Sequence, residues 1–176
     1  MALLREPHDV ISGLPVDDPV AAAVQITEAL DAINCADSMT LEERYDDICL
    51  LDAATVDHTR SLLREYLQTS RQTKQRESDL WNGAYNCWQA LATAYVTCVQ
   101  QYAAEKDASA GFAKLARVAT ARAIRALRRQ LQWLRIRYAQ PVPSIWMGLA
   151  NLYQFIEHEN IEEELLVYPG EHTTIK

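Results

Sequence analysis

Cationic side chains recur along residues 112–139, and these are the groups in this sequence best suited to chemistry with another molecule. Guanidinium groups bind carboxylates and phosphates through paired hydrogen bonds and keep their charge at physiological pH. At 100° per residue, the cations fall within about 140° on one side of a helix. They are Lys114, Arg117, Arg122, Arg125, Arg128, Arg129 and Arg135. The pattern therefore predicts a basic helix face that binds anionic groups.

Two interpretations of this basic face stay open. In the first, the face is solvated and pairs with acids of the same chain at residues 40–70. Those acids include Asp46, Asp47, Asp52 and Asp57. In the second, it is a docking surface for an acidic protein surface, which another copy of the chain can supply. We favour docking, because residues 40–70 hold too few acids to pair with every arginine. The predicted partner-binding residues are Arg117, Arg122, Arg125, Arg128, Arg129 and Arg135.

Charge is distributed unevenly along the chain, whose formal net charge is −7. Residues 1–70 hold 14 acids and 4 bases, residues 71–140 hold 4 acids and 12 bases, and residues 141–176 hold 6 acids and 1 base. A basic centre between acidic ends favours pairing within the chain or between chains. The acidic ends repel polyanions, so we expect nucleic acid to be a poor partner.

Motifs for catalysis and metal binding are not found in the sequence. The histidines form neither HxxxH nor HExxH, and no ExxH of the kind used by di-iron bundles occurs. These histidines are His8, His58, His158 and His172. The five glycines cannot build GxxxxGK[ST] or GxGxxG, and no GxSxG is present. We therefore expect a protein that is not an enzyme and that holds no metal or cofactor.

The cysteines indicate a reducing compartment. Cys35, Cys49, Cys87 and Cys98 form no CxxC pair, and all four are predicted to lie in apolar helical patterns, which is typical of reduced core positions. The sequence opens without a charged leader followed by an apolar run. It also lacks a run of about 18 apolar residues, the length that a membrane-spanning helix needs. We expect a cytoplasmic protein without a membrane span.

The N-terminal region predicts an irregular arm followed by a helix. Residues 1–16 hold two prolines and a glycine, which interrupt helices. Asp17 or Asp18 then starts the first helix, because Pro19 suits the first turn. A single helical domain is predicted over residues 17–176, as part of a longer protein.

The second helix is predicted to begin at a capping box. Thr40 and Glu43 have the spacing at which the two side chains satisfy free backbone N–H groups. An apolar stripe then continues to about Ser70. The polar run at residues 70–78 is the best candidate for a linker.

The third helix, predicted over residues 79–105, has the widest apolar face. Two adjacent apolar stripes follow it, which indicates a central position in a bundle. Trp88, Leu91 and Tyr95 lie at the centre of this face and are expected among the most buried residues. The side chains expected nearest the surface are those at its ends, Trp81 and Tyr102.

A turn at residues 107–111 precedes the fourth helix, which is predicted over residues 112–139. Shorter helices are predicted at residues 144–158 and 160–166. Together these patterns predict an all-α fold, a helical bundle of four to six helices.

Three stretches resemble the helical N-terminal region of long proteobacterial proteins that also carry a PilZ domain. They are LWNGAYNCWQALATAY at Leu80–Tyr95, PSIWMGLANLYQF at Pro143–Phe155, and the final VYPGEHTTIK. PilZ is a β-barrel that binds cyclic di-GMP. The resemblance covers residues 40–176 and implies a role in cyclic di-GMP signalling, with the ligand domain lying beyond residue 176.

The nucleotide-binding signature of PilZ, RxxxR followed by [D/N]xSxxG, is not carried over to this chain. RxxxR occurs at Arg60–Arg64 and Arg125–Arg129, and Asp107–Gly111 places its glycine one residue early. All three segments lie in or between predicted helices. We therefore predict a non-enzymatic helical regulatory or protein–protein interaction domain. The alternative is a module that binds an anionic ligand or nucleic acid through the arginine-rich face.

Overall fold

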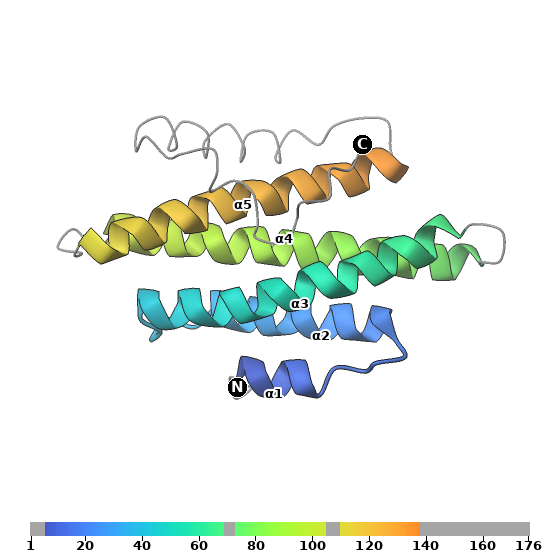
Figure 1. The fold of residues 1–176 in the computed structure, drawn as a ribbon, viewed down its shortest axis with the longest axis horizontal. Coiled ribbons are helices and arrows are strands. Elements are labelled where there is room, and N and C mark those ends of the chain that lie inside the picture. Colours follow the sequence, from blue (N-terminus) through green and yellow to red (C-terminus); the bar gives the residue numbers. More distant parts are fainter. Residues whose placement is uncertain (1–5, 69–72, 105–109, 138–176) are drawn as a thin grey trace.

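The computed structural model describes residues 6–68, 73–104 and 110–137, which form five helices and no strand (Figure 1). The helices are α1 (Pro7–Ser12), α2 (Pro19–Asn34), α3 (Leu41–Leu67), α4 (Lys74–Ala104) and α5 (Ala110–Arg137). The prediction of an all-α bundle is confirmed. The helices predicted at residues 144–158 and 160–166 lie outside the described residues. Within the described part, no helix is long and apolar enough to cross a bilayer.

Side-chain caps start two of the helices where the sequence predicts. The Asp18 carboxylate accepts a hydrogen bond from the Ala21 N–H at 3.2 Å, and Pro19 follows at the first position of α2. The Thr40 hydroxyl accepts from the Glu43 N–H at 3.2 Å and starts α3. Each cap satisfies a backbone donor that the helix itself leaves free.

The prediction of an irregular arm over residues 1–16 is wrong at α1. Pro7 is the first residue of this short helix, where its missing N–H costs nothing. Val10 in the helix and Leu14 after it join the core, with 4% and 8% of their surfaces exposed. Helix α1 packs against α2 and α3, because this packing buries the two apolar side chains away from water. The division into an arm and one domain stays a prediction.

Helix α4 begins earlier than predicted, so the expected linker at residues 70–78 is wrong from Lys74 onward. The Thr73 hydroxyl accepts a hydrogen bond from the Arg76 N–H at 3.1 Å, as an N-cap does. Arg76 also donates to both carboxylate oxygens of Glu65 on α3, at 2.7 and 3.0 Å. These contacts fix the first turn of α4 against α3.

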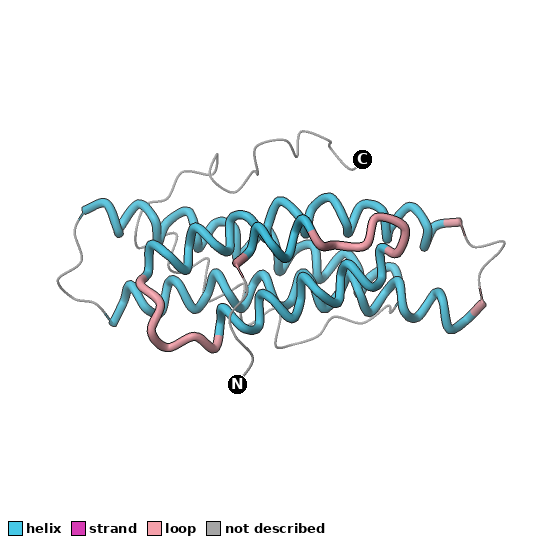
Figure 2. Tube along the Cα trace, turned by 90° about the horizontal axis from the view of Figure 1, so that it is seen from below, coloured by secondary structure: helices cyan, strands magenta, loops and turns pink. Residues whose placement is uncertain are grey.

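Helix α4 is the centre of the bundle and packs against α2, α3 and α5 (Figure 1). Seen from below, the long helices run along the same axis of the bundle (Figure 2). The prediction that Trp88, Leu91 and Tyr95 are among the most buried residues is confirmed. Trp88 is 3% exposed, and Leu91 and Tyr95 are completely buried. The two adjacent apolar stripes of α4 therefore face three neighbouring helices.

Trp81 does not reach the surface as expected, since only 6% of it is exposed. Its indole N–H donates to the Trp133 carbonyl of α5 at 2.8 Å. Its ring stacks on Tyr85 with centroids 4.8 Å apart, and Trp133 packs edge-on against Tyr66 at 5.7 Å. A buried tryptophan N–H needs an acceptor, and the hydrogen bond to the Trp133 carbonyl therefore allows Trp81 to be buried. Tyr102, at the other end of α4, is half-buried.

Replacing Leu91 by alanine is expected to lower the free energy of unfolding by roughly 2–5 kcal/mol, because a fully buried leucine leaves a cavity. Urea unfolding followed by circular dichroism measures this loss. Gln89→Ala, at an exposed position of the same helix, is the matched control and is expected to change stability by less than about 0.5 kcal/mol. A Leu91→Ala protein as stable as this control would show that α4 is not central.

Candidate functional site

The arginines of α5 lie on one side of the helix, but they are not equally exposed. Three of them, Arg117, Arg128 and Arg135, are exposed and are called the outer arginine row below. Arg125 points inward and is only 5% exposed, while Arg122 and Arg129 are half-buried. The expectation that the arginines of the basic face are open to a partner is therefore wrong for Arg125. Whether the remaining predicted residues bind a partner stays a prediction.

Arg125 is buried because it forms an ion pair with Asp52 of α3. Its Nη2 lies 2.6 Å from both carboxylate oxygens of Asp52, whose side chain is completely buried. The Arg125 guanidinium also lies over the Trp88 ring of α4, 5.4 Å from the centroid. An ion pair out of water is tolerated only with good geometry and further polar contacts. Here one arginine connects α5 to both α3 and α4.

Tyr95 of α4 completes the coordination of the Asp52 carboxylate. Its hydroxyl donates to Oδ2 of Asp52. Burial, and then the negative charge of Asp52, raise the pKa of Tyr95 well above the usual value. The phenol therefore stays protonated and available as a donor. Asp52 thus receives hydrogen bonds from two different helices.

Arg122 lies next to this ion pair and contacts α3 and α4. Its Nη1 donates to the Cys49 sulfur at 2.8 Å and to the Tyr95 hydroxyl at 3.4 Å. The guanidinium lies 5.8 Å from the centroid of the Tyr45 ring. Burial raises the pKa of the Cys49 thiol, although Arg122 acts in the opposite direction. Because the thiolate is the reactive form, this cluster stabilises helix packing and does not activate Cys49.

Asp52 differs most from its expected surroundings. It was named among the acids at residues 40–70 that pair with a solvated basic face, but it is completely buried. Its position in the sequence indicates burial. Asp52 follows Ile48 by four residues and precedes Thr55 by three, and both of these residues are fully buried on the same side of the helix. An acid at a core position of a heptad-like stripe needs a buried partner. That partner is Arg125.

Arg44 of α3 is a second buried arginine that was not predicted from the sequence, and its contacts hold helices together. Only 5% of it is exposed. Its guanidinium donates to the carbonyls of Ile33 and Ala36 and to the Gln101 side chain, the last two at 2.5 and 2.9 Å. These carbonyls lie at the C-terminal end of α2, where the helix dipole favours a cation. Arg44 therefore joins the end of α2 to α3 and α4.

The outer arginine row is a straight line of charge along α5. Steps of 11 and 7 residues at 100° each keep its members within about 20° of one line, and 18 residues of helix span about 27 Å. Helix α5 contains no acidic residue, so no carboxylate on the same helix pairs with the row. Lys114, one turn before Arg117, is exposed as well. Any counter-charge for these cations must therefore come from outside α5.

All four cysteines are free, but they occupy different environments. Burial raises the pKa of Cys87 and Cys98 to about 12. Cys35 is exposed and follows the last residue of α2, so the expectation that all four lie in apolar positions is wrong for Cys35. Among the described residues, no group of three or more histidine, cysteine or acidic side chains gathers in a way that could hold a metal ion.

These features define an all-α bundle in which arginines of one helix both complete the core and form an outer basic row. The chain belongs to the family described as the N-terminal domain of the cyclic-di-GMP receptor FimW, which it matches over residues 5–176. No curated protein and no solved structure matches it. The predicted resemblance to the helical N-terminal region of cyclic di-GMP signalling proteins is confirmed.

Proposed function

We propose that this chain is a non-enzymatic regulatory domain that binds an acidic protein surface through the outer arginine row of α5. The observation that carries this proposal is the row itself: three exposed guanidinium groups in one line on a helix without acids. Guanidinium groups pair well with carboxylates, and complementary charge gives specificity and fast association. Membership in a cyclic-di-GMP receptor family supports a role in signalling.

The length of the row favours a protein over a nucleotide. The two phosphates of cyclic di-GMP belong to one small ring, whereas the row extends over about 27 Å of helix. An extended acidic surface, such as the side of a partner helix, can meet all three arginines at once. Burial of Arg125 with Asp52 removes the arginine that would have widened the row into a compact patch.

Direct binding of an anionic ligand is the second candidate, because the family is described as a cyclic-di-GMP receptor. In this case the outer arginine row would contact the phosphates. Calorimetric titration of the chain with cyclic di-GMP separates the two candidates. Heat that disappears on Arg128→Glu would favour the ligand, and the absence of heat is the result expected from a protein-binding row.

Reversing the outer row is expected to weaken binding to an acidic polypeptide at least tenfold, a change of about 1.4 kcal/mol. The variant is Arg117→Glu/Arg128→Glu/Arg135→Glu, and the probe is fluorescent poly-L-glutamate followed by anisotropy. The measurement is made at an ionic strength of about 0.1 M, because the screening length is then about 10 Å and long-range, non-specific attraction between charges is weakened.

The matched control reverses three other exposed cations, Arg60, Arg64 and Lys74, which lie on α3 and at the start of α4. It changes the net charge by the same amount. The control is expected to bind poly-L-glutamate almost as the parent does. Equal losses in both variants would mean that net charge alone governs binding, and the outer row would then have no special role.

A further inference from the structure

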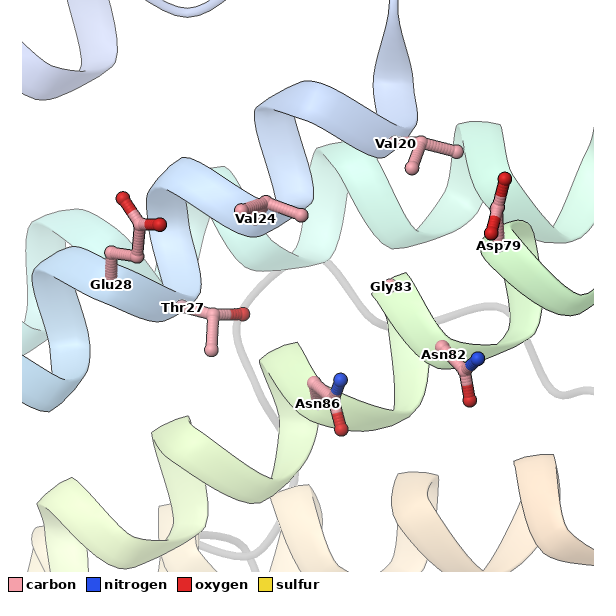
Figure 3. A pocket seen from close by; sticks show the side chains of 8 residues that line it. All are labelled: Val20, Val24, Thr27, Glu28, Asp79, Asn82, Gly83 and Asn86. Carbon is pink, nitrogen blue, oxygen red and sulfur yellow. The ribbon is translucent and has the colours of Figure 1, made fainter.

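A groove lies between α2 and α4 (Figure 3). It encloses about 220 Å³. Glu28 of α2 lies near one end of the groove and Asp79 of α4 near the other, with Val24 between them (Figure 3). Neither the outer row nor the buried Arg125 cluster includes any of these residues.

Close packing of the two helices gives the groove an apolar floor. Gly83 of α4 is buried, and a Cβ at this position would lie 3.4 Å from the Ala23 Cβ and 3.6 Å from Leu62 Cδ1. No side chain therefore projects from α4 at this point. Val20 and Val24 form the α2 side, and Val24 is 48% exposed although it is large and apolar. This apolar surface can pack against the aliphatic stem of a long side chain.

The polar groups of the groove favour a cation. Its lining includes the carboxylates of Glu28 and Asp79 and the amides of Asn82 and Asn86, and it includes no basic residue. Helix α2 likewise contains no basic residue. Asp31, on the same helix as Glu28, adds a further acid outside the groove lining; burial, and then the negative charge of Glu28, raise its pKa.

The size and chemistry of the groove fit one long cationic side chain. Its volume lies below the roughly 300–1,000 Å³ of ordinary small-molecule sites, and its acids repel phosphates. Arginine and lysine place an aliphatic stem on apolar surface while their charged heads reach polar groups. An arginine stem over the valines would bring its guanidinium to the carboxylate at one end of the groove.

We propose that the groove binds an arginine from the outer arginine row of a second copy of this chain, so that the domain self-associates. This inference rests on the proposed function, because it names one acidic site that an arginine of the row binds. Charge complementarity supports the choice of partner: α5 has no acid and α2 has no base. The row and the groove both lie on the surface of one copy, and α2 and α5 each pack on α4. A row on one copy can therefore meet the groove of another.

Sedimentation velocity of the full chain over a range of concentrations tests this contact. The groove variant is Glu28→Lys/Asp79→Lys, and the row variant is Arg117→Glu/Arg128→Glu/Arg135→Glu. The parent is expected to self-associate, and each variant alone is expected to associate at least tenfold more weakly. An equimolar mixture of the two variants is expected to associate again, because the unchanged row of the groove variant then meets the unchanged groove of the row variant.

A gentler variant, Glu28→Gln/Asp79→Asn, removes the groove charges without reversing them and guards against misfolding. It is also expected to lose self-association. A parent that stays monomeric, or charge-free groove variants that associate like the parent, would overturn the self-association contact. If the row variant still loses poly-L-glutamate binding in that case, the proposed function stands and the row binds a different acidic protein. If it keeps that binding, the proposed function fails as well.

Discussion

Replacing Asp52 by alanine is expected to lower the free energy of unfolding by about 3–5 kcal/mol, because the change leaves the buried Arg125 charge without its carboxylate. The Tyr95 hydroxyl loses its acceptor at the same time. A loss of this size is a large part of the total stability of a domain, which is typically about 5–15 kcal/mol. Urea unfolding of both proteins under the same conditions measures the difference.

Two comparisons make this result specific to the ion pair. Asp57→Ala, at an exposed position of α3, is expected to change stability by less than about 0.5 kcal/mol. The double variant Asp52→Leu/Arg125→Met replaces both charges by apolar groups, and it is expected to recover most of the loss, because neither charge then lacks a partner. An Asp52→Ala protein as stable as Asp57→Ala would show that the carboxylate is not buried.

Reversing Arg122, Arg125 and Arg129 to glutamate is expected to abolish cooperative unfolding. The Arg125→Glu change would place a second carboxylate beside the buried Asp52, and the contacts of Arg122 with Cys49 and Tyr95 would be lost. Each buried charge without a partner costs several kcal/mol, so the changes together approach the whole stability of a typical domain, about 5–15 kcal/mol. Circular dichroism during heating is the measurement, and a sharp transition near the parent temperature would contradict the inward contacts of Arg122 and Arg125.

Arg129→Glu alone is the control for this triple variant. Arg129 is half-buried and donates to Gln132 on its own helix at 3.1 Å. The single reversal is expected to leave a cooperative transition. The difference between the two variants therefore reports on Arg122 and Arg125.

Local signals explain which parts of the fold were predictable. Asp18 and Thr40 are capping residues, and a cap depends only on residues two or three positions along the chain. The paired apolar stripes of α4 place Trp88, Leu91 and Tyr95 at its centre, because a wide apolar face needs several neighbours. Short-range chemistry and helical period therefore predicted two helix starts and the central helix.

The direction of individual arginines depends on tertiary packing, which a helical wheel does not contain. The wheel correctly groups the cations of α5 on one side, but it cannot say how much of that side a neighbouring helix covers. The decisive partner, Asp52, lies 73 residues before Arg125 in the sequence. The sequence offered Asp52 as one of several acids at residues 40–70 that could pair with the basic face, but it did not single out this pair.

The groove and α1 were missed for a related reason. Each depends on close approach between segments that a pattern within one helix does not report. Gly83 allows α4 to approach α2 and α3, and Val10 and Leu14 bind the N-terminal segment to the bundle. Prolines near residues 7 and 15 signalled interruptions, but they do not exclude a short helix between them.

The central claim is that the arginines of α5 divide into an inward set that stabilises the bundle and an outward row that binds an acidic partner. Urea unfolding of two triple variants side by side tests it most directly, since both reverse three arginines of the same helix and change the net charge equally. We predict that Arg117→Glu/Arg128→Glu/Arg135→Glu keeps stability within about 1.5 kcal/mol of the parent, the sum expected for three surface changes. We predict that Arg122→Glu/Arg125→Glu/Arg129→Glu has no cooperative transition. Equal losses in the two variants would contradict the division.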